Sequence, residues 1–208
     1  MTARKKRIAV LASGRGSNLQ SLLDACVAPD YPAAVSLVIV NVPGAKAIDR
    51  AQQAGVPVEV INHKDYAGRE PFDAAIDAAL RKADIELVCL AGFMRLLTPG
   101  FTRAWEGRLL NIHPSLLPAY PGLHTHRRAL EAGDKFHGCT IHFVTPDLDA
   151  GPTILQQAVP VQDGDDEDKL AARVLEAEHV LYPAALKLVA EGRARMENGK
   201  TVIESLDS

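Results

Sequence analysis

The chain has 208 residues, of which 47% are hydrophobic and 24% are charged, and its formal net charge is −3. This composition is ordinary for a soluble globular protein long enough to bury a core. The slightly negative charge argues against binding to the phosphate backbone of nucleic acids, and the three widely spaced cysteines form neither a disulfide framework nor a zinc motif.

The first part of the chain alternates short apolar runs with amphipathic stretches. The apolar runs predict strands at 7–13, 35–41, 56–61, 85–92 and 107–113. The amphipathic stretches predict helices at 17–26, 45–55 and 69–83. Because strand and helix alternate, we expect an α/β fold with a mostly parallel, twisted sheet and helices on both faces.

The pattern changes after residue 135. Two apolar runs at 138–145 and 153–161 are joined by a turn-rich loop, which predicts a pair of antiparallel strands. A long amphipathic helix is expected at 166–192, opening with acidic residues as its dipole prefers. The Asn-Gly pair within 193–205 predicts a terminal hairpin. No linker divides the chain, so we expect one domain over 1–208.

No stretch approaches the length of a membrane span, and the apolar run IAVLA is too short for a signal peptide. Buried, reduced thiols are the expected state of the cysteines. Together these features predict a cytoplasmic protein with no membrane partner.

A glycine-rich turn, SGRGSNLQ at 13–20, joins the first predicted strand to a helix. Free N–H groups at such a helix start form a cradle for anions. The dinucleotide fingerprint is incomplete, because Leu19 stands at its third glycine position and the second strand ends at Asn41 instead of an acid. A small phosphate ester therefore fits better than a nicotinamide cofactor or ATP, although a simple tight turn remains an alternative.

The string NIHPS places Asn111 and His113 on the same side of one strand, since every second residue of a strand points the same way. Pro114 ends that strand, so the pair lies at its carboxyl edge, where open α/β sheets bind ligands. Two N–H donors at one point stabilise a developing oxyanion. The alternative is a structural histidine.

The loop TPDLDAG carries Asp147 and Asp149. Aspartate is common in turns for conformational reasons alone. The functional interpretation puts one carboxylate beside His113, where it favours the charged imidazolium that can serve as a general acid. We expect no metal. The spacing of His124 and His126 suits a strand, whereas their segment is predicted as a loop entering a helix, and no HExxH or paired-cysteine motif occurs. A Gly-x-Ser-x-Gly elbow is also missing.

Four strings together resemble the folate-dependent formyltransferases: SGRGSNLQ, LAGFMRLL, LLNIHPSLLPAYPGLHTHRRALEAG and IHFVTPDLDAGPTILQ. The resemblance runs from about residue 7 to about residue 192. Within this superfamily, the SGRGSN loop and the short length point to the phosphoribosylglycinamide formyltransferases. The resemblance implies a Rossmann-like formyltransferase fold, with a phosphate-binding half at about 1–105 and a folate-binding, catalytic half at about 106–208.

The resemblance further implies an enzyme of purine synthesis that transfers the formyl group of 10-formyltetrahydrofolate to the amine of 5'-phosphoribosylglycinamide. Its catalytic residues would be Asn111, His113 and Asp149. The ribonucleotide would be bound by Gly16, Ser17, Asn18 and Glu178. The folate would be held by Arg69, Met94, Arg95, Leu96, Leu97, Asn111, Thr145, Pro146, Asp147, Leu148 and Asp149.

Three alternatives differ in what accepts the formyl group, or in whether one is transferred. A methionyl-tRNA formyltransferase would carry an RNA-binding domain after the long helix, and a formyltetrahydrofolate hydrolase would carry a regulatory domain before the first strand. A non-catalytic sensor of phosphate metabolites would keep the glycine turn without needing the Asn-His-Asp set. The expected partners are small molecules, and a homodimer is left open.

Overall fold

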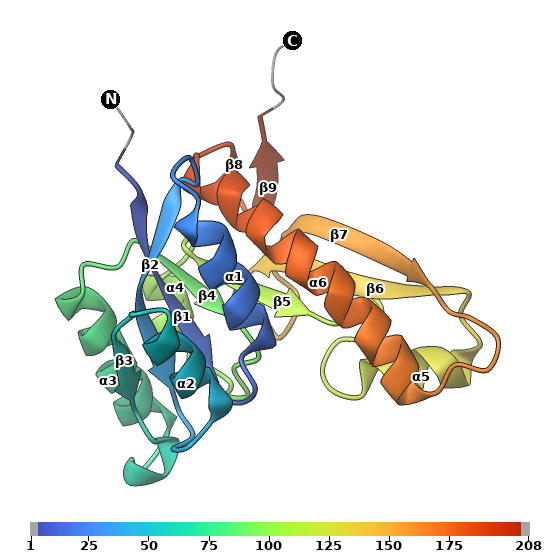
Figure 1. Ribbon diagram of the computed structural model, residues 1–208, viewed down its shortest axis with the longest axis horizontal. Coiled ribbons are helices and arrows are strands. Elements are labelled where there is room, and N and C mark those ends of the chain that lie inside the picture. The colour runs from blue at the N-terminus through green and yellow to red at the C-terminus, as the bar shows by residue number, and fades with distance from the viewer. Residues whose placement is uncertain (1–3, 205–208) are drawn as a thin grey trace. The chain divides into compact units, whose positions relative to one another are not determined.

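The structure is a computed structural model that describes residues 4–204, shown as a ribbon in Figure 1. Its strands are β1 (Lys6–Ala12), β2 (Ala33–Val40), β3 (Val58–Val60), β4 (Leu87–Leu90), β5 (Leu109–His113), β6 (Phe136–Phe143), β7 (Thr153–Pro160), β8 (Ala194–Glu197) and β9 (Lys200–Ile203). Its helices are α1 (Ser17–Val27), α2 (Lys46–Gln53), α3 (Arg69–Lys82), α4 (Pro99–Ala104), α5 (Thr125–Ala132) and α6 (Glu167–Ala190), and one 3-10 turn, η1, covers His63–Asp65.

The hydrogen-bonded strand order is β3-β2-β1-β4-β5-β6-β7, and β8 pairs with β9 in a separate sheet. This arrangement confirms the predicted fold class: a mostly parallel sheet with helices, ending in antiparallel strands. By its contacts the chain forms two compact units that divide between Leu110 and Asn111. The expectation of one domain over 1–208 stays a prediction.

The first unit is built around β1, which is buried along Ile8–Ala12 and pairs in parallel with β2 and β4. The chain runs from β1 to β2 to β3 in one direction and then crosses to β4 on the other side of β1. Crossover connections between parallel strands are right-handed, so α1 and α2 cover one face of these strands and α3 covers the opposite face. This winding brings the carboxyl ends of β1, β2 and β4 to the same edge.

The second unit contains the antiparallel pair β6 and β7, and the 24-residue helix α6 packs against both strands (Figure 1). The first turn of α6 is capped by Asp166, whose carboxylate accepts a hydrogen bond from the Lys169 N–H at 2.8 Å. Glu167 and Asp168 follow, as the helix dipole prefers. Apolar residues such as Leu170, Tyr182 and Leu186 are fully buried, which holds α6 in place.

The terminal hairpin forms as predicted between β8 and β9. Asn198 and Gly199 have φ values of 50° and 73°, the backbone conformation that a two-residue hairpin turn requires. The last residue of the predicted hairpin segment, Ser205, lies outside the described residues.

Helix α4 was not predicted. It has only six residues and includes Gly100, so it is too short to show a recognisable helical spacing of apolar residues. Its start is set by Thr98, whose hydroxyl accepts a hydrogen bond from the Phe101 N–H at 3.3 Å, followed by a proline at the first helical position. Within residues 4–204, no helix has the length and apolar character needed to span a bilayer.

Candidate active site

In the second unit, Asn111 and His113 lie at the end of β5, directly before Pro114. Their spacing of two residues on a strand puts both side chains on one side of the sheet. His113 is 5% exposed, and Asn111 is half-buried. An amide and an imidazole therefore stand together where the strand stops.

The structure brings Asp149 to this pair from the loop between β6 and β7. Its Oδ2 atom lies 3.4 Å from His113 Nδ1, and both side chains are buried. The same Oδ2 atom accepts a hydrogen bond from the backbone N–H of Gly122 at 2.8 Å. Asp149 has a φ of 51°, a conformation that aspartate tolerates better than most residues. The hydrogen bond from Gly122 and the backbone conformation of Asp149 thus hold the carboxylate in place.

The second nitrogen of His113 also faces an acceptor. Nε2 lies 2.9 Å from the backbone carbonyl oxygen of Tyr120. A carbonyl and a carboxylate can only accept hydrogen bonds. One ring nitrogen of His113 thus faces a carbonyl oxygen and the other faces a carboxylate oxygen.

His142, on β6, contacts the other side of Asn111. Its Nε2 lies 3.1 Å from Asn111 Nδ2 and 4.0 Å from Asp149 Oδ1, and its Nδ1 lies 2.9 Å from the Phe143 carbonyl oxygen. Only 2% of His142 is exposed, and this burial lowers its pKa below the ordinary value. His142 could not be recognised from the sequence, because a lone histidine in an apolar strand resembles a core residue.

The remaining predicted residues of the second unit lie at different depths. Thr145 is half-buried, whereas Pro146, Asp147 and Leu148 are exposed along the loop that ends at Asp149. Glu178 is buried on α6, although its side chain is polar. The loop residues lie near Asp149 because they directly precede it in the chain. Leu148 is 57% exposed.

In the first unit, the glycine turn leads from β1 into α1. Gly16 has a φ of 71° and sits at the helix start, where a Cβ would lie 2.9 Å from the Cα and Cβ atoms of Ala47. Only glycine fits this close approach of α2 to the turn. Ser17 begins α1 and Asn18 is buried, so the predicted anion cradle starts at the end of a buried strand.

Ser13 ties this turn to two other predicted segments. Its hydroxyl donates to Asn41 Oδ1 at 2.6 Å and accepts a hydrogen bond from the Met94 N–H at 2.8 Å. Asn41 Nδ2 in turn lies 3.3 Å from His63 Nδ1. The segment 94–97 is therefore anchored beside the glycine turn. Sequence reasoning missed Ser13 and His63, whose roles depend on contacts between strand ends.

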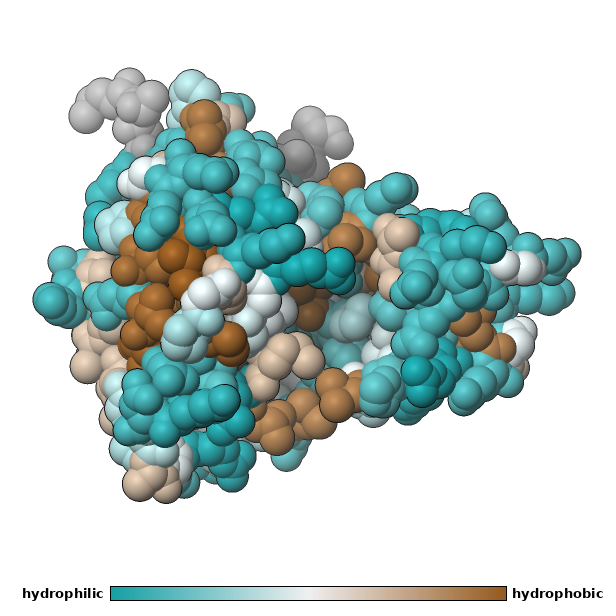
Figure 2. Space-filling model, turned by 60° about the horizontal axis from the view of Figure 1, so that its bottom comes forward, coloured by the Kyte–Doolittle hydropathy of each residue, from teal (hydrophilic) through white to brown (hydrophobic). Residues whose placement is uncertain are grey.

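Three side chains of the 94–97 segment are exposed and Leu97 is half-buried; Met94 is 66% exposed and Leu96 57% exposed. Figure 2 shows a face on which hydrophobic residues gather in patches within a mostly hydrophilic surface. Exposed methionine and leucine side chains suit an apolar ring system as ligand. Arg69, the first residue of α3, is exposed as well.

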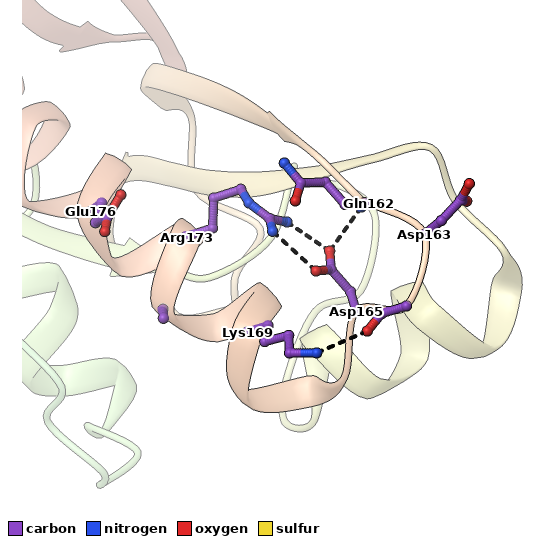
Figure 3. Close-up of a pocket in the computed structure, with 8 residues that line it drawn as sticks. Gln162, Asp163, Asp165, Lys169, Arg173 and Glu176 are labelled. Atoms are coloured by element: carbon purple, nitrogen blue, oxygen red, sulfur yellow. Dashed lines mark hydrogen bonds and ion pairs between the residues drawn. The ribbon is translucent and has the colours of Figure 1, made fainter.

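A further hollow of about 430 Å³ lies at the start of α6, in the acidic run that precedes the helix (Figure 3). Arg173 points into it and donates to both oxygens of Asp165, at 2.7 and 3.0 Å. This paired guanidinium lowers the pKa of Asp165 to about 2. Asp165 already balances the charge of Arg173, and none of the predicted site residues lines the hollow.

No group of three or more histidine, cysteine or acidic side chains within residues 4–204 is arranged to hold a metal ion. The side chains that the structure gathers at the end of β5 are hydrogen-bond donors and one carboxylate. Asn111 and His113 supply donors, and Asp149 supplies the charge that stabilises an imidazolium.

Comparison with known proteins shows the family of the chain. Residues 6–186 match the family model described as "Formyl transferase". The chain belongs to the formyl transferase family. The matched region includes the glycine turn, the Asn111 and His113 pair, the Asp149 loop and Glu178, so all the predicted site residues fall within the family domain.

Three relatives illustrate the family's range. The phosphoribosylglycinamide formyltransferase of Escherichia coli (strain K12) is 48% identical over 189 residues, which are 91% of this chain and 89% of that protein. The crystal structure of glycinamide ribonucleotide transformylase 1 from Symbiobacterium toebii has a TM-score of 0.94 and 46% identity, covering 98% of this chain and 96% of the other. The trifunctional purine biosynthetic protein adenosine-3 of Drosophila melanogaster is 53% identical over 93% of this chain, and the chain spans 14% of its length.

Proposed function

We propose that this chain transfers the formyl group of 10-formyltetrahydrofolate to the amine of 5'-phosphoribosylglycinamide, a step of purine synthesis. The observation that carries the proposal is the buried contact of His113 with Asp149, 3.4 Å apart, next to Asn111 at a strand end. Family relatives that span similar lengths and bear this activity in their names support it.

The proposed roles follow from what each side chain can donate or accept. The N–H groups of Asn111 and His113 stabilise negative charge on the formyl oxygen, an effect worth about 3–4 kcal/mol per well-placed donor. Asp149 balances the charge of the His113 imidazolium and orients its ring. Both His113 nitrogens already face acceptors, so the formyl oxygen must take the place of one acceptor. We propose that it replaces the Tyr120 carbonyl, because that acceptor is neutral whereas Asp149 is the counter-charge.

Bound 10-formyltetrahydrofolate would supply an activated formyl carbon. The amine nitrogen of the ribonucleotide forms a bond to that carbon while the bond between the carbon and N10 breaks, and one proton passes from the amine to N10. No covalent bond to the protein is required. His113 as the imidazolium can hold the proton that balances the developing oxyanion.

Each unit carries proposed binding residues of its own. In the first unit, Gly16, Ser17 and Asn18 would cradle the phosphate at the start of α1, and Arg69 with the segment 94–97 would contact the folate. In the second unit, Glu178 would contact the glycinamide and the loop 145–149 would contact the folate. These assignments rest on the resemblance of each motif.

The test is a rate measurement with the purified protein, phosphoribosylglycinamide and 10-formyltetrahydrofolate, following loss of the formyl group by absorbance. We expect turnover only when both substrates are present. The variant His113→Ala should lower kcat about 100-fold or more, because a general acid contributes at least that much. His124→Asn is a matched control, since His124 is exposed and its φ of 57° suits asparagine.

Other outcomes would identify the alternatives. Deformylation without the ribonucleotide would indicate a hydrolase, and transfer only to methionyl-tRNA would indicate a different acceptor. Tight binding of the ribonucleotide with no turnover would indicate a metabolite sensor. The cytoplasmic location, the homodimer and the lack of nucleic-acid binding stay predictions.

A further inference from the structure

We propose that His142 is a positioning residue for the formyl transfer, holding the Asn111 amide so that one N–H stays free to point at the formyl oxygen. The inference rests on the proposed function, because it assigns Asn111 the role of an oxyanion donor. It is carried by two contacts of one buried imidazole, to Phe143 and to Asn111.

The first step is the tautomer of His142. Its Nδ1 lies 2.9 Å from the backbone carbonyl oxygen of Phe143. A carbonyl oxygen has no proton to donate, so Nδ1 must carry the hydrogen of this bond. In the neutral ring, Nε2 is then left with a lone pair.

The second step is the orientation of the Asn111 amide. The Nε2 lone pair of His142 faces Asn111 Nδ2 at 3.1 Å and accepts one of its two N–H groups. The amide oxygen cannot take that place, because it would face the lone pair. The imidazole therefore orients the amide with its nitrogen toward His142. The second N–H of Asn111 remains available to another acceptor.

The third step is the charge on His142. Asp149 Oδ1, at 4.0 Å from Nε2, favours the protonated ring, whereas burial and the neighbouring His113 favour the neutral ring. Burial is the largest of these effects, since only 2% of His142 is exposed to solvent. The neutral form is the one that the two hydrogen bonds require.

A protonated His142 would reverse this arrangement. Its Nε2–H would point at the N–H groups of Asn111, and the amide would turn to present its oxygen instead. The donor that stabilises the formyl oxygen would then be misplaced. The position of Asn111 thus depends on a histidine that touches no reacting atom.

The experiment compares kcat, KM and the pH profile of the parent protein with two variants. His142→Leu removes the acceptor and should lower kcat about 10- to 100-fold with KM for the ribonucleotide nearly unchanged, since a misplaced donor costs rate more than binding. His142→Gln carries an amide oxygen near the position of Nε2 and cannot titrate. It should restore kcat to within about fivefold of the parent, because it returns the acceptor. His124→Asn again serves as the control histidine variant.

Circular dichroism establishes that each variant is folded. A folded His142→Leu protein with kcat within about threefold of the parent would overturn the inference, because the lost orientation should cost more. Equal loss in His142→Gln and His142→Leu would also overturn it, since the acceptor would then not be what matters.

A second measurement does not depend on turnover or on the variants. Nitrogen-15 NMR of the parent protein at pH 7 should show His142 protonated on Nδ1 and unprotonated on Nε2. A proton on Nε2 would overturn the inference even in a fully active enzyme. If the parent shows no formyl transfer from 10-formyltetrahydrofolate to phosphoribosylglycinamide, the proposed function fails. The NMR result still shows which nitrogen of His142 carries the proton.

Discussion

Gly151 lies so close to Phe143 that a Cβ on the glycine would be 1.8 Å from the Phe143 carbonyl oxygen. The same carbonyl accepts the hydrogen bond from His142 Nδ1. The backbone of the loop that carries Asp149 is thereby packed directly against the backbone that orients His142. A side chain at position 151 must displace one of the two.

We therefore expect Gly151→Ala to destabilise the protein and to lower activity. The added methyl group overlaps backbone and not a flexible side chain, so the free energy of unfolding should fall by about 1–3 kcal/mol or more. Urea unfolding and formyl-transfer rates measure the two effects. Gly100→Ala is the control, because its nearest neighbour is Thr98 Oγ1 at 4.0 Å and alanine favours its helix. Equal stability of both variants would contradict the prediction.

Gly16→Ala tests the glycine turn of the first unit. The new Cβ would meet Ala47 at 2.9 Å, and the φ of 71° strains any residue with a side chain. We expect a loss of about 1–3 kcal/mol of stability and weaker binding of the ribonucleotide, measured by denaturation and by calorimetry.

The matched control for this turn is Gly14→Ala. No atom lies within 4 Å of its added Cβ, and its φ is not in the left-handed region. Its stability and ribonucleotide affinity should stay close to those of the parent. If both variants weaken binding alike, the close packing at Gly16 is not what shapes the cradle.

Asp149→Asn removes one charge while nearly preserving shape. The Gly122 N–H can still donate to the amide oxygen, so the loop should remain in place. The His113 imidazolium loses its counter-charge, and kcat should fall about 100-fold or more. Asp163→Asn, in the exposed run before α6, controls for the loss of an acidic residue. Stopped assays across pH 6 to 9 measure the effect, and an unchanged kcat in Asp149→Asn would refute the role of the carboxylate.

His137 predicts a pH dependence of stability. The side chain is 1% exposed, and burial, the largest cause, lowers its pKa from 6.5 to about 4. Between these values the unfolded chain binds a proton that the folded protein does not. Stability is therefore complete above pH 6.5 and falls as the pH drops toward 4, by about 3 kcal/mol for this group alone.

His137→Phe keeps an aromatic ring beside Tyr120 and His126 but cannot take up a proton. Urea unfolding of parent and variant at pH 7 and pH 5 measures the difference in slope. The variant should lose less stability between the two pH values than the parent. Identical losses would mean that His137 titrates normally in the folded protein.

The sequence by itself determined the order and type of the main elements. Alternating apolar and amphipathic stretches predicted the parallel strands with their helices, the β6 and β7 pair, and the long helix α6. The Asn198 and Gly199 turn was readable because few residues adopt positive φ values. Asn111 and His113 could be paired from sequence because strand geometry alone puts residues two apart on one side.

Only the tertiary structure decided what surrounds that pair. The contact of Asp149 with His113 was only a hypothesis from the sequence. This contact, the acceptor at His142 and the backbone groups of Tyr120 and Gly122 all come from segments outside β5. Periodicity and propensity report local geometry, whereas these contacts depend on strand register and loop conformation. A backbone carbonyl or N–H is also present at nearly every residue, so its role leaves no mark in the amino-acid sequence.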